Sequence, residues 1–102
     1  MTQLQNITSK FASSDLQKKL SLYGISHFAI FGSYARSEAH KESDLDVVLD
    51  LLPQNNITLW TLEEIENLLK EELSIPSVDF VMRRSMNPRL KPYIEKDIIT
   101  IF

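Results

Sequence analysis

The sequence predicts a single small domain of the α/β or α+β class, built from one β-sheet flanked by helices. Its 102 residues are the size of one domain. Hydrophobic residues make up 43% of the chain and charged residues 25%, which is typical of a protein with a folded core. Apolar runs of strand length alternate with segments of helical periodicity, so the strands are expected to form one sheet against which the helices pack.

The chain begins with a polar segment, and residues 1–12 are interpreted as a loosely held arm. A first helix is expected to follow, with Ser13 or Ser14 as its cap and Gly24 as its stop. The apolar face of this helix consists of Leu16, Leu20 and Tyr23.

Four short segments are expected to form one small mixed sheet. Segment 25–31 is an apolar run that ends at Gly32, which indicates a buried strand. Segment 44–52 is β-branched and apolar until Pro53 stops it. The remaining two strands are expected at 77–82 and 98–102.

Three helices are expected to alternate with these strands. Residues 33–38 can form a short helix directly after the first strand. Residues 58–73 carry leucines and isoleucine at helical spacing, but Thr61 and Glu64 also fit a capping box that would start the helix one turn later. Trp60, at the start of this helix, is expected to lie partly in the core, with a partner contact as the alternative.

The last helical segment, 87–98, gives conflicting signals. Asn87 is a candidate cap and Pro88 fits the first helical position. Pro92 argues against a regular helix through that point, because proline removes a backbone donor and clashes with the preceding turn.

Charge and cysteine content exclude several functions. The net charge is −3, whereas proteins that coat nucleic acid are usually basic. The chain has no cysteine, which excludes disulfides, zinc–thiolate sites and thiol nucleophiles. No segment has the pattern of a signal peptide or of a membrane span. We therefore expect a cytoplasmic protein with no direct contact to nucleic acid or membrane.

Two aspartates stand in the second predicted strand, where aspartate is normally disfavoured. Asp44 and Asp46 are two residues apart, so both carboxylates are expected on one face of the strand. A solvated strand edge or a turn cap is the structural alternative. A divalent cation would relieve the repulsion between the two carboxylates, and hard oxygen ligands suit magnesium.

Asp79 in the third predicted strand can complete this site if the second and third strands are neighbours. Three carboxylates that hold two magnesium ions, or manganese in their place, form the clamp used for in-line phosphoryl or nucleotidyl transfer. Asp50, farther along the second strand, is interpreted as a solvated cap rather than a ligand.

The turn after the first strand has the composition of a phosphate cradle. Gly32 lets a phosphate approach the main chain, and Ser33 adds a hydroxyl donor. Arg36 lies in the same turn and can neutralise phosphate charge, although an ordinary surface arginine is the alternative.

These residues carry a resemblance to a known family. Gly32-Ser33, ten intervening residues, Asp44-x-Asp46 and the later VDFV around Asp79 closely resemble the minimal nucleotidyltransferases of the polymerase-β superfamily. The chain is similar to the antitoxin half of HEPN/MNT toxin–antitoxin pairs over roughly residues 14–102.

The resemblance implies a polymerase-β-like nucleotidyltransferase fold and transfer of AMP from ATP to a tyrosine of a partner HEPN ribonuclease toxin, which silences the toxin. It implies that Gly32 and Ser33 hold the triphosphate, that Asp44 and Asp46 ligate two magnesium ions, and that Asp79 is the third carboxylate and the base. The alternative is a non-catalytic antitoxin that blocks its partner by occlusion.

Two further features qualify this interpretation. Ser37 stands where the family often has glycine after the arginine, which would add strain if the position needs a positive φ. A basic group in this acidic chain is either a solvated face or a contact for ATP or a partner; it consists of Arg83, Arg84, Arg89 and Lys91.

Overall fold

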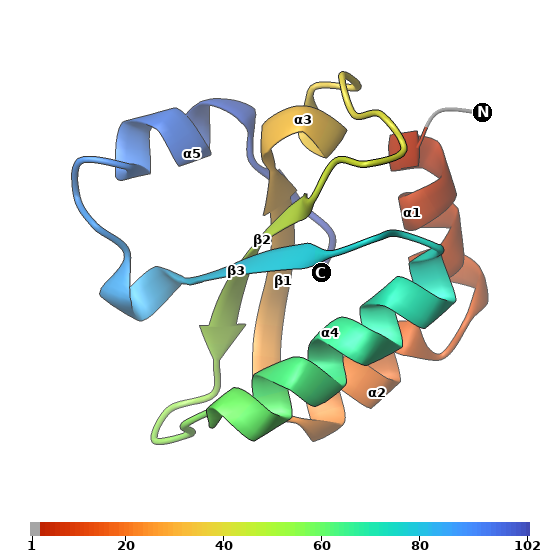
Figure 1. Ribbon diagram of the computed structural model, residues 1–102. Helices are drawn as coiled ribbons and strands as arrows, with labels where there is room; N and C mark the ends of the chain where they lie inside the picture. The colour runs from red at the N-terminus through yellow and green to blue at the C-terminus, as the bar shows by residue number, and fades with distance from the viewer. Residues whose placement is uncertain (1–2) are drawn as a thin grey trace.

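A four-stranded mixed sheet forms the centre of the protein in the computed structural model, which describes residues 3–102 (Figure 1). The strand order is β3-β2-β1-β4, with β1 paired antiparallel to both β2 and β4, and β2 paired parallel to β3. The strands are β1 (Ile25–Phe31), β2 (Leu45–Leu51), β3 (Val78–Met82) and β4 (Ile99–Thr100). The predicted fold class is therefore confirmed.

Three helices cover one face of the sheet, and a short C-terminal helix covers part of the other (Figure 1). The first face carries α1 (Gln3–Ser13), α2 (Leu16–Leu22) and α4 (Leu59–Leu73), and the second carries α5 (Lys91–Asp97). Alternate residues of β2 divide between the faces: Val47 packs in the main core, while Val48 packs against Ile94 of α5.

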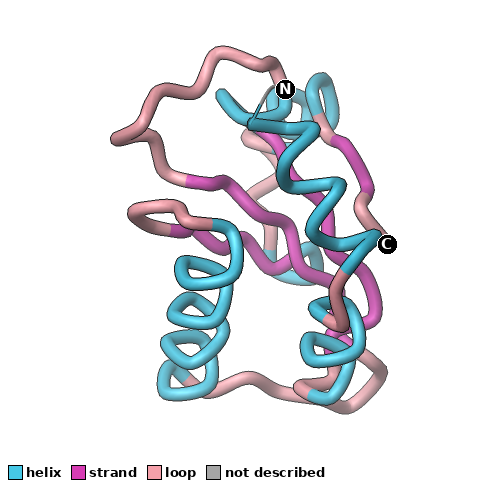
Figure 2. Tube along the Cα trace, turned by 90° about the vertical axis from the view of Figure 1, so that its right-hand side faces the viewer, coloured by secondary structure: helices cyan, strands magenta, loops and turns pink. Residues whose placement is uncertain are grey.

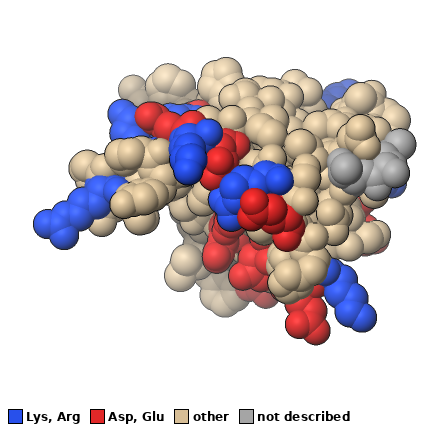
Figure 3. All heavy atoms as spheres, turned by 90° about the horizontal axis from the view of Figure 1, so that it is seen from above, with Lys and Arg blue, Asp and Glu red and all other residues tan. Residues whose placement is uncertain are grey.

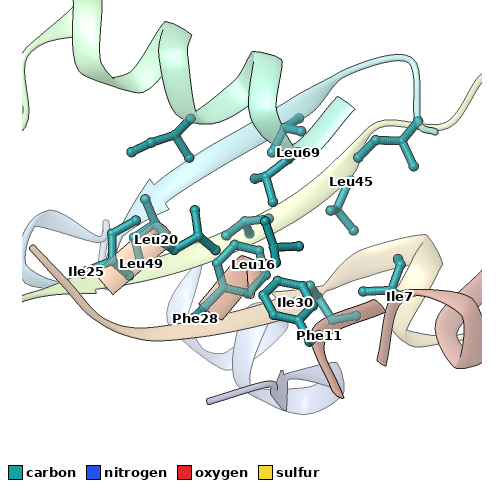
Figure 4. Close-up of a cluster of buried hydrophobic side chains, with 14 of the residues drawn as sticks. Ile7, Phe11, Leu16, Leu20, Ile25, Phe28, Ile30, Leu45, Leu49 and Leu69 are labelled. Atoms are coloured by element: carbon teal, nitrogen blue, oxygen red, sulfur yellow. The ribbon is translucent and has the colours of Figure 1, made fainter. Parts of the chain in front are cut away.

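The main core is built from large aliphatic and aromatic side chains of β1, β2 and the three helices, as Figure 4 shows. Leu16 and Leu20 of α2 are completely buried against Phe28 of β1 and its neighbours. Each such side chain contributes about 1.5–3 kcal/mol through its removal from water. Gly24 follows α2 with φ 87°, so the predicted glycine stop is confirmed.

The prediction that the chain begins with a loosely held arm is wrong for residues 3–12, because they belong to helix α1. Residues 1 and 2 lie outside the described part of the chain. Ile7 and Phe11, four positions apart on one face of α1, are buried. The ring of Phe11 lies 5.0 Å from that of Phe28 and 6.0 Å from that of Phe102. Figure 2 shows the C-terminus beside the end of this helix. Leu4, Ile7 and Phe11 stand at helical spacing in this otherwise polar segment, and this spacing could have indicated the helix.

Helix α4 begins at the earlier of its two candidate starts. Thr58 is its N-cap, and its hydroxyl accepts a hydrogen bond of 3.2 Å from the Thr61 amide. Trp60 is 80% exposed, so the expectation that it lies partly in the core is wrong. The buried residues Ile65 and Leu69 stand about 140–180° around the helix from Trp60 at about 100° per residue.

Helix α5 starts at Lys91 rather than at Pro88. Asn87 does act as a local cap, but of a turn: its side-chain oxygen accepts from the Arg89 amide at 2.9 Å. Pro92 then occupies the first turn of the helix, where its missing amide donor costs nothing. No helix in the described residues is long and apolar enough to cross a membrane.

Candidate active site

Asp46 and Asp79 lie side by side on the face of the sheet that α5 only partly covers. They are register partners in the parallel pairing of β2 with β3. Leu45 and Val47, on either side of Asp46, point into the main core instead. The expected neighbourhood of the second and third strands is therefore confirmed, and it brings two of the three predicted carboxylates together.

Asp44 was expected to be the first residue of the second strand. It lies one residue before β2, which starts at Leu45. Its carboxylate accepts a hydrogen bond from the hydroxyl of Ser77, which lies just before β3. The Leu45 amide also donates to the Ser77 carbonyl at 3.0 Å. The start of β2 is thus fixed against the start of β3, with Asp44 at the mouth of the site.

The charges of Asp44 and Asp79 act on Asp46. Burial raises the pKa of Asp46, and the negative charges of Asp79 and Asp44 raise it further, while Arg36 lowers it. Among the described residues, the positive charge of Arg36 therefore only partly offsets the negative charge around Asp46. Figure 3, which views the molecule from this end, shows acidic and basic side chains intermixed rather than one uniformly basic surface.

The donor set of this site suits a hard divalent cation. Within residues 3–102, no three His, Cys, Asp or Glu side chains already converge as a preformed metal cage. Asp44 and Asp79 are exposed at the rim and Asp46 is partly buried between them. Open carboxylates of this kind fit magnesium, which keeps several waters and is usually bound through one or two carboxylates plus substrate phosphates.

Gly32 brings the turn after β1 against Asp46. Phe31, the last residue of β1, is the register partner of Asp46 in the antiparallel pairing. Gly32 has φ 74°, which favours glycine, and a Cβ at this position would collide with Asp46 Oδ2. Any side chain here would therefore close the space in front of that carboxylate.

Ser33 follows within the single helical turn α3 (Gly32–Ala35), which is shorter than the expected helix over 33–38. The Arg36 amide closes this turn on the Gly32 carbonyl at 3.0 Å. Among the described residues the Ser33 hydroxyl has no hydrogen-bond partner, so it is free to donate to a ligand.

Arg36 is held by two carboxylates rather than left open toward the site. Its Nη1 lies 2.9 Å from Asp97 Oδ2 of α5, and its Nε lies 3.2 Å from Glu38 Oε2. The geometry thus ties the turn after β1 to the C-terminal helix, and the predicted phosphate contact of Arg36 stays a prediction.

One residue of this region, Ser77, was not anticipated from the sequence. Ser77 lies two residues before Asp79, and this spacing could have indicated a hydroxyl on the same side as the carboxylates. Arg83 contacts Asp50, with Nε 2.9 Å from Oδ2. Asp50 is therefore ion-paired within the protein, which corrects its interpretation as a solvated cap.

Ser37 has a positive φ of 59°, which is the condition under which the sequence predicts strain at this position. The Ser37 amide donates to the Tyr34 carbonyl at 3.2 Å, so the left-handed residue ends the turn that carries Gly32 and Ser33. A serine here holds a conformation that glycine would adopt without steric cost.

Comparison with known proteins agrees with this arrangement. Residues 13–101 match the family model described as a nucleotidyltransferase domain. A protein of Methanocaldococcus jannaschii, named as a candidate protein adenylyltransferase, is 42% identical over 80 residues, which cover 78% of this chain and 79% of the relative.

Solved structures show the same fold. One described as a candidate minimal nucleotidyltransferase aligns with a TM-score of 0.72 and 26% identity over 97% of this chain and 95% of that chain. A Shewanella oneidensis complex of an MNT antitoxin with a tri-AMPylated HEPN toxin contains a chain that aligns with a TM-score of 0.56 and 17% identity, over 85% and 69% of the two chains. The resemblance found in the sequence is thus confirmed, and the chain belongs to the nucleotidyltransferase domain family.

Proposed function

We propose that this protein is a magnesium-dependent adenylyltransferase that moves AMP from ATP to a tyrosine hydroxyl of a partner HEPN toxin and so neutralises it. The observation that carries the proposal is the pairing of Asp46 with Asp79 directly beside the Gly32 turn. The name of the 42% identical relative supports protein adenylylation. The fold shared with an MNT antitoxin bound to a tri-AMPylated HEPN toxin supports the partner.

The carboxylates would hold the metal ions, and the turn would hold the triphosphate. Asp44, Asp46 and Asp79 supply oxygen ligands for two magnesium ions, which when bound would neutralise phosphate charge. Gly32, which has no side chain and lies against Asp46, would let a phosphate approach the main chain, and the free Ser33 hydroxyl would donate a hydrogen bond to it. These roles match those that the family resemblance implies for the same positions.

The transfer itself forms one bond and breaks one. The tyrosine oxygen of the partner bonds to the α-phosphorus of ATP, while the bond from that phosphorus to the bridging oxygen breaks and pyrophosphate leaves. Asp79, exposed at the rim on the edge strand, accepts the hydroxyl proton. Because Asp79 is exposed, a docked partner would raise the effective concentration of its tyrosine at the site.

Intact-mass spectrometry of the partner tests this function. The HEPN-type toxin is incubated with the wild-type protein, ATP and magnesium, and we expect its mass to rise by whole AMP units. The Asp46→Asn variant serves as the matched control and should leave the mass unchanged. Neutralisation of the toxin by that variant, with no mass change in either reaction, would instead support occlusion without catalysis.

A further inference from the structure

A shallow apolar groove of about 270 Å³ opens beside the Gly32 turn. Gly32 itself lines one end of it, together with Arg36. The remaining walls come from β1, β3 and the α5 region, and consist of Phe31, Val81, Leu90, Tyr93 and Ile94. This groove was not anticipated from the sequence, and the proposed roles of the aspartates and the turn do not use it.

The groove lies on the same sheet face as the carboxylates. Phe31 is the register partner of Asp46, and Val81 comes two residues after Asp79 on β3. Residues two apart in a strand share a face. The groove therefore borders the turn that is proposed to hold the triphosphate, and its other wall is formed by the α5 region.

The chemistry of the lining favours a flat, uncharged ring. Leu90 is 49% and Tyr93 75% exposed, so an aliphatic and an aromatic side chain stand open at the rim. The charged lining residue Arg36 is already paired with Asp97. Pockets for drug-sized ligands usually measure about 300–1,000 Å³, and this smaller groove suits a single ring system.

We propose that this groove binds the base of the nucleotide, with the ring of Tyr93 as the surface on which the base stacks. The inference rests on the proposed function and extends it to the base. A base is joined through its ribose to the phosphates, so it must lie within one nucleotide's length of Gly32. An aromatic face at that distance binds a base by stacking and without reading its edges.

The position of Tyr93 is set by the ion pair between Arg36 and Asp97. Asp97 lies four residues after Tyr93, one helical turn farther along α5. Its contact with Arg36 joins that helix to the turn after β1. The phosphate turn and the stacking surface are thus held at a fixed separation, which a bound nucleotide would span.

NMR titration of the magnesium-loaded protein with ATP, and separately with inorganic tripolyphosphate, tests this inference. Tyr93→Ala should weaken ATP affinity by roughly 5- to 150-fold, the usual worth of one base–aromatic stack. The same variant should leave tripolyphosphate affinity unchanged, because that ligand has no base. Tyr93→Phe should retain ATP affinity, since the ring remains.

Trp60→Ala is the matched control, because Trp60 is an exposed aromatic residue outside the groove. It should leave both affinities unchanged. Unchanged ATP affinity in Tyr93→Ala would overturn the inference, as would an equal loss of ATP and tripolyphosphate binding. Reduced AMP transfer to the partner with unchanged ATP affinity would also overturn it, by making the groove a protein contact. In each of these cases the proposed function would still hold if the wild-type protein transfers AMP to the partner and the Asp46→Asn variant does not.

Discussion

Arg36, at the end of the turn after β1, is ion-paired with Asp97 at the end of α5, with 2.9 Å between Nη1 and Oδ2. The Asp97 side chain is 18% exposed and that of Arg36 42%, so the pair is partly shielded from water. The contact connects two elements that are far apart in the sequence and that both border the proposed nucleotide site.

Asp97→Asn is therefore expected to loosen α5 and raise the KM for ATP by roughly 2- to 5-fold, matching the 0.5–1 kcal/mol of a partly exposed ion pair. The value of kcat should change little. Glu38→Gln, which removes the other partner of Arg36, is the control and should have a smaller effect. A lower KM in Asp97→Asn would contradict this role and would support a phosphate contact by the released Arg36.

Asp46→Asn is expected to abolish AMP transfer without unfolding the protein, because the variant loses a central metal ligand while it keeps the shape of the side chain. Transfer is followed by intact-mass spectrometry and folding by circular dichroism. Transfer at the wild-type rate by a folded Asp46→Asn protein would disprove the metal site.

The same variant should be more stable than the wild type when metal is absent. Burial and two neighbouring carboxylates raise the pKa of Asp46, so its ionised form destabilises the folded state. The increase in Tm of Asp46→Asn over the wild type should be largest at neutral pH, where the wild-type carboxyl is ionised. It should shrink as the pH falls through the raised pKa, where the wild-type carboxyl is neutral as well. Thermal unfolding in EDTA across this pH range measures the effect, and added magnesium should reverse the order.

Ser33→Ala should weaken transfer less than Asp46→Asn does. One hydrogen bond to a charged phosphate is worth about 1.5–3 kcal/mol, or roughly 10- to 150-fold in rate. Backbone groups of the turn remain in place in this variant. Steady-state kinetics with ATP provide the comparison, and a loss as complete as that of Asp46→Asn would assign the hydroxyl a chemical role.

Ser37→Gly is expected to stabilise the protein slightly. The left-handed conformation of Ser37 costs a side-chain-bearing residue about 1–2 kcal/mol, of which the added freedom of glycine in the unfolded chain offsets about 0.4–1 kcal/mol. A rise of a few degrees in Tm, with AMP transfer retained, is the expected outcome. A fall in Tm would show that the serine is held by interactions that compensate its strain.

Arg84→Glu should slow modification of the protein partner. Arg84 is exposed just after β3 and has no ion-pair partner among the described residues, whereas Arg83 is bound to Asp50. Charges at the rim of an interface act mainly on the association rate. The test compares kcat/KM for the toxin at low and high salt. Equal values of kcat/KM for Arg84→Glu and wild type at low salt would show that Arg84 does not assist association with the toxin.

The sequence was most informative where a residue has few physical alternatives. Gly32 must be glycine because of its positive φ and its close approach to Asp46. Asp44 and Asp46 are two residues apart, so in an extended chain their side chains lie on the same face. The position of Asp79 was harder to predict, because it depends on which strands pair. The parallel pairing of β2 with β3 confirms that Asp79 lies beside Asp46.

The remaining features depend on contacts that no local pattern encodes. Helix α1 is held by Phe11, whose ring contacts Phe28 of β1 and Phe102, a residue far away in the sequence. Trp60 could not be placed before the start of α4 was fixed at Thr58. The groove beside Gly32 requires α5 to lie on the second face of the sheet, which its proline-interrupted sequence did not indicate.

The parallel pairing of β2 with β3 also sets the order in which the protein can become active. Strands β1 and β2 are close in sequence and form an antiparallel pair, so the turn and Asp46 can meet through a short loop closure. Asp79 arrives only after the whole of α4 has crossed the sheet and β3 has docked at its edge. Such long-range pairing is slow to form. A nascent or partly folded chain therefore lacks Asp79 beside Asp46, and we expect recovery of activity during refolding to follow the docking of β3 rather than the collapse of the core.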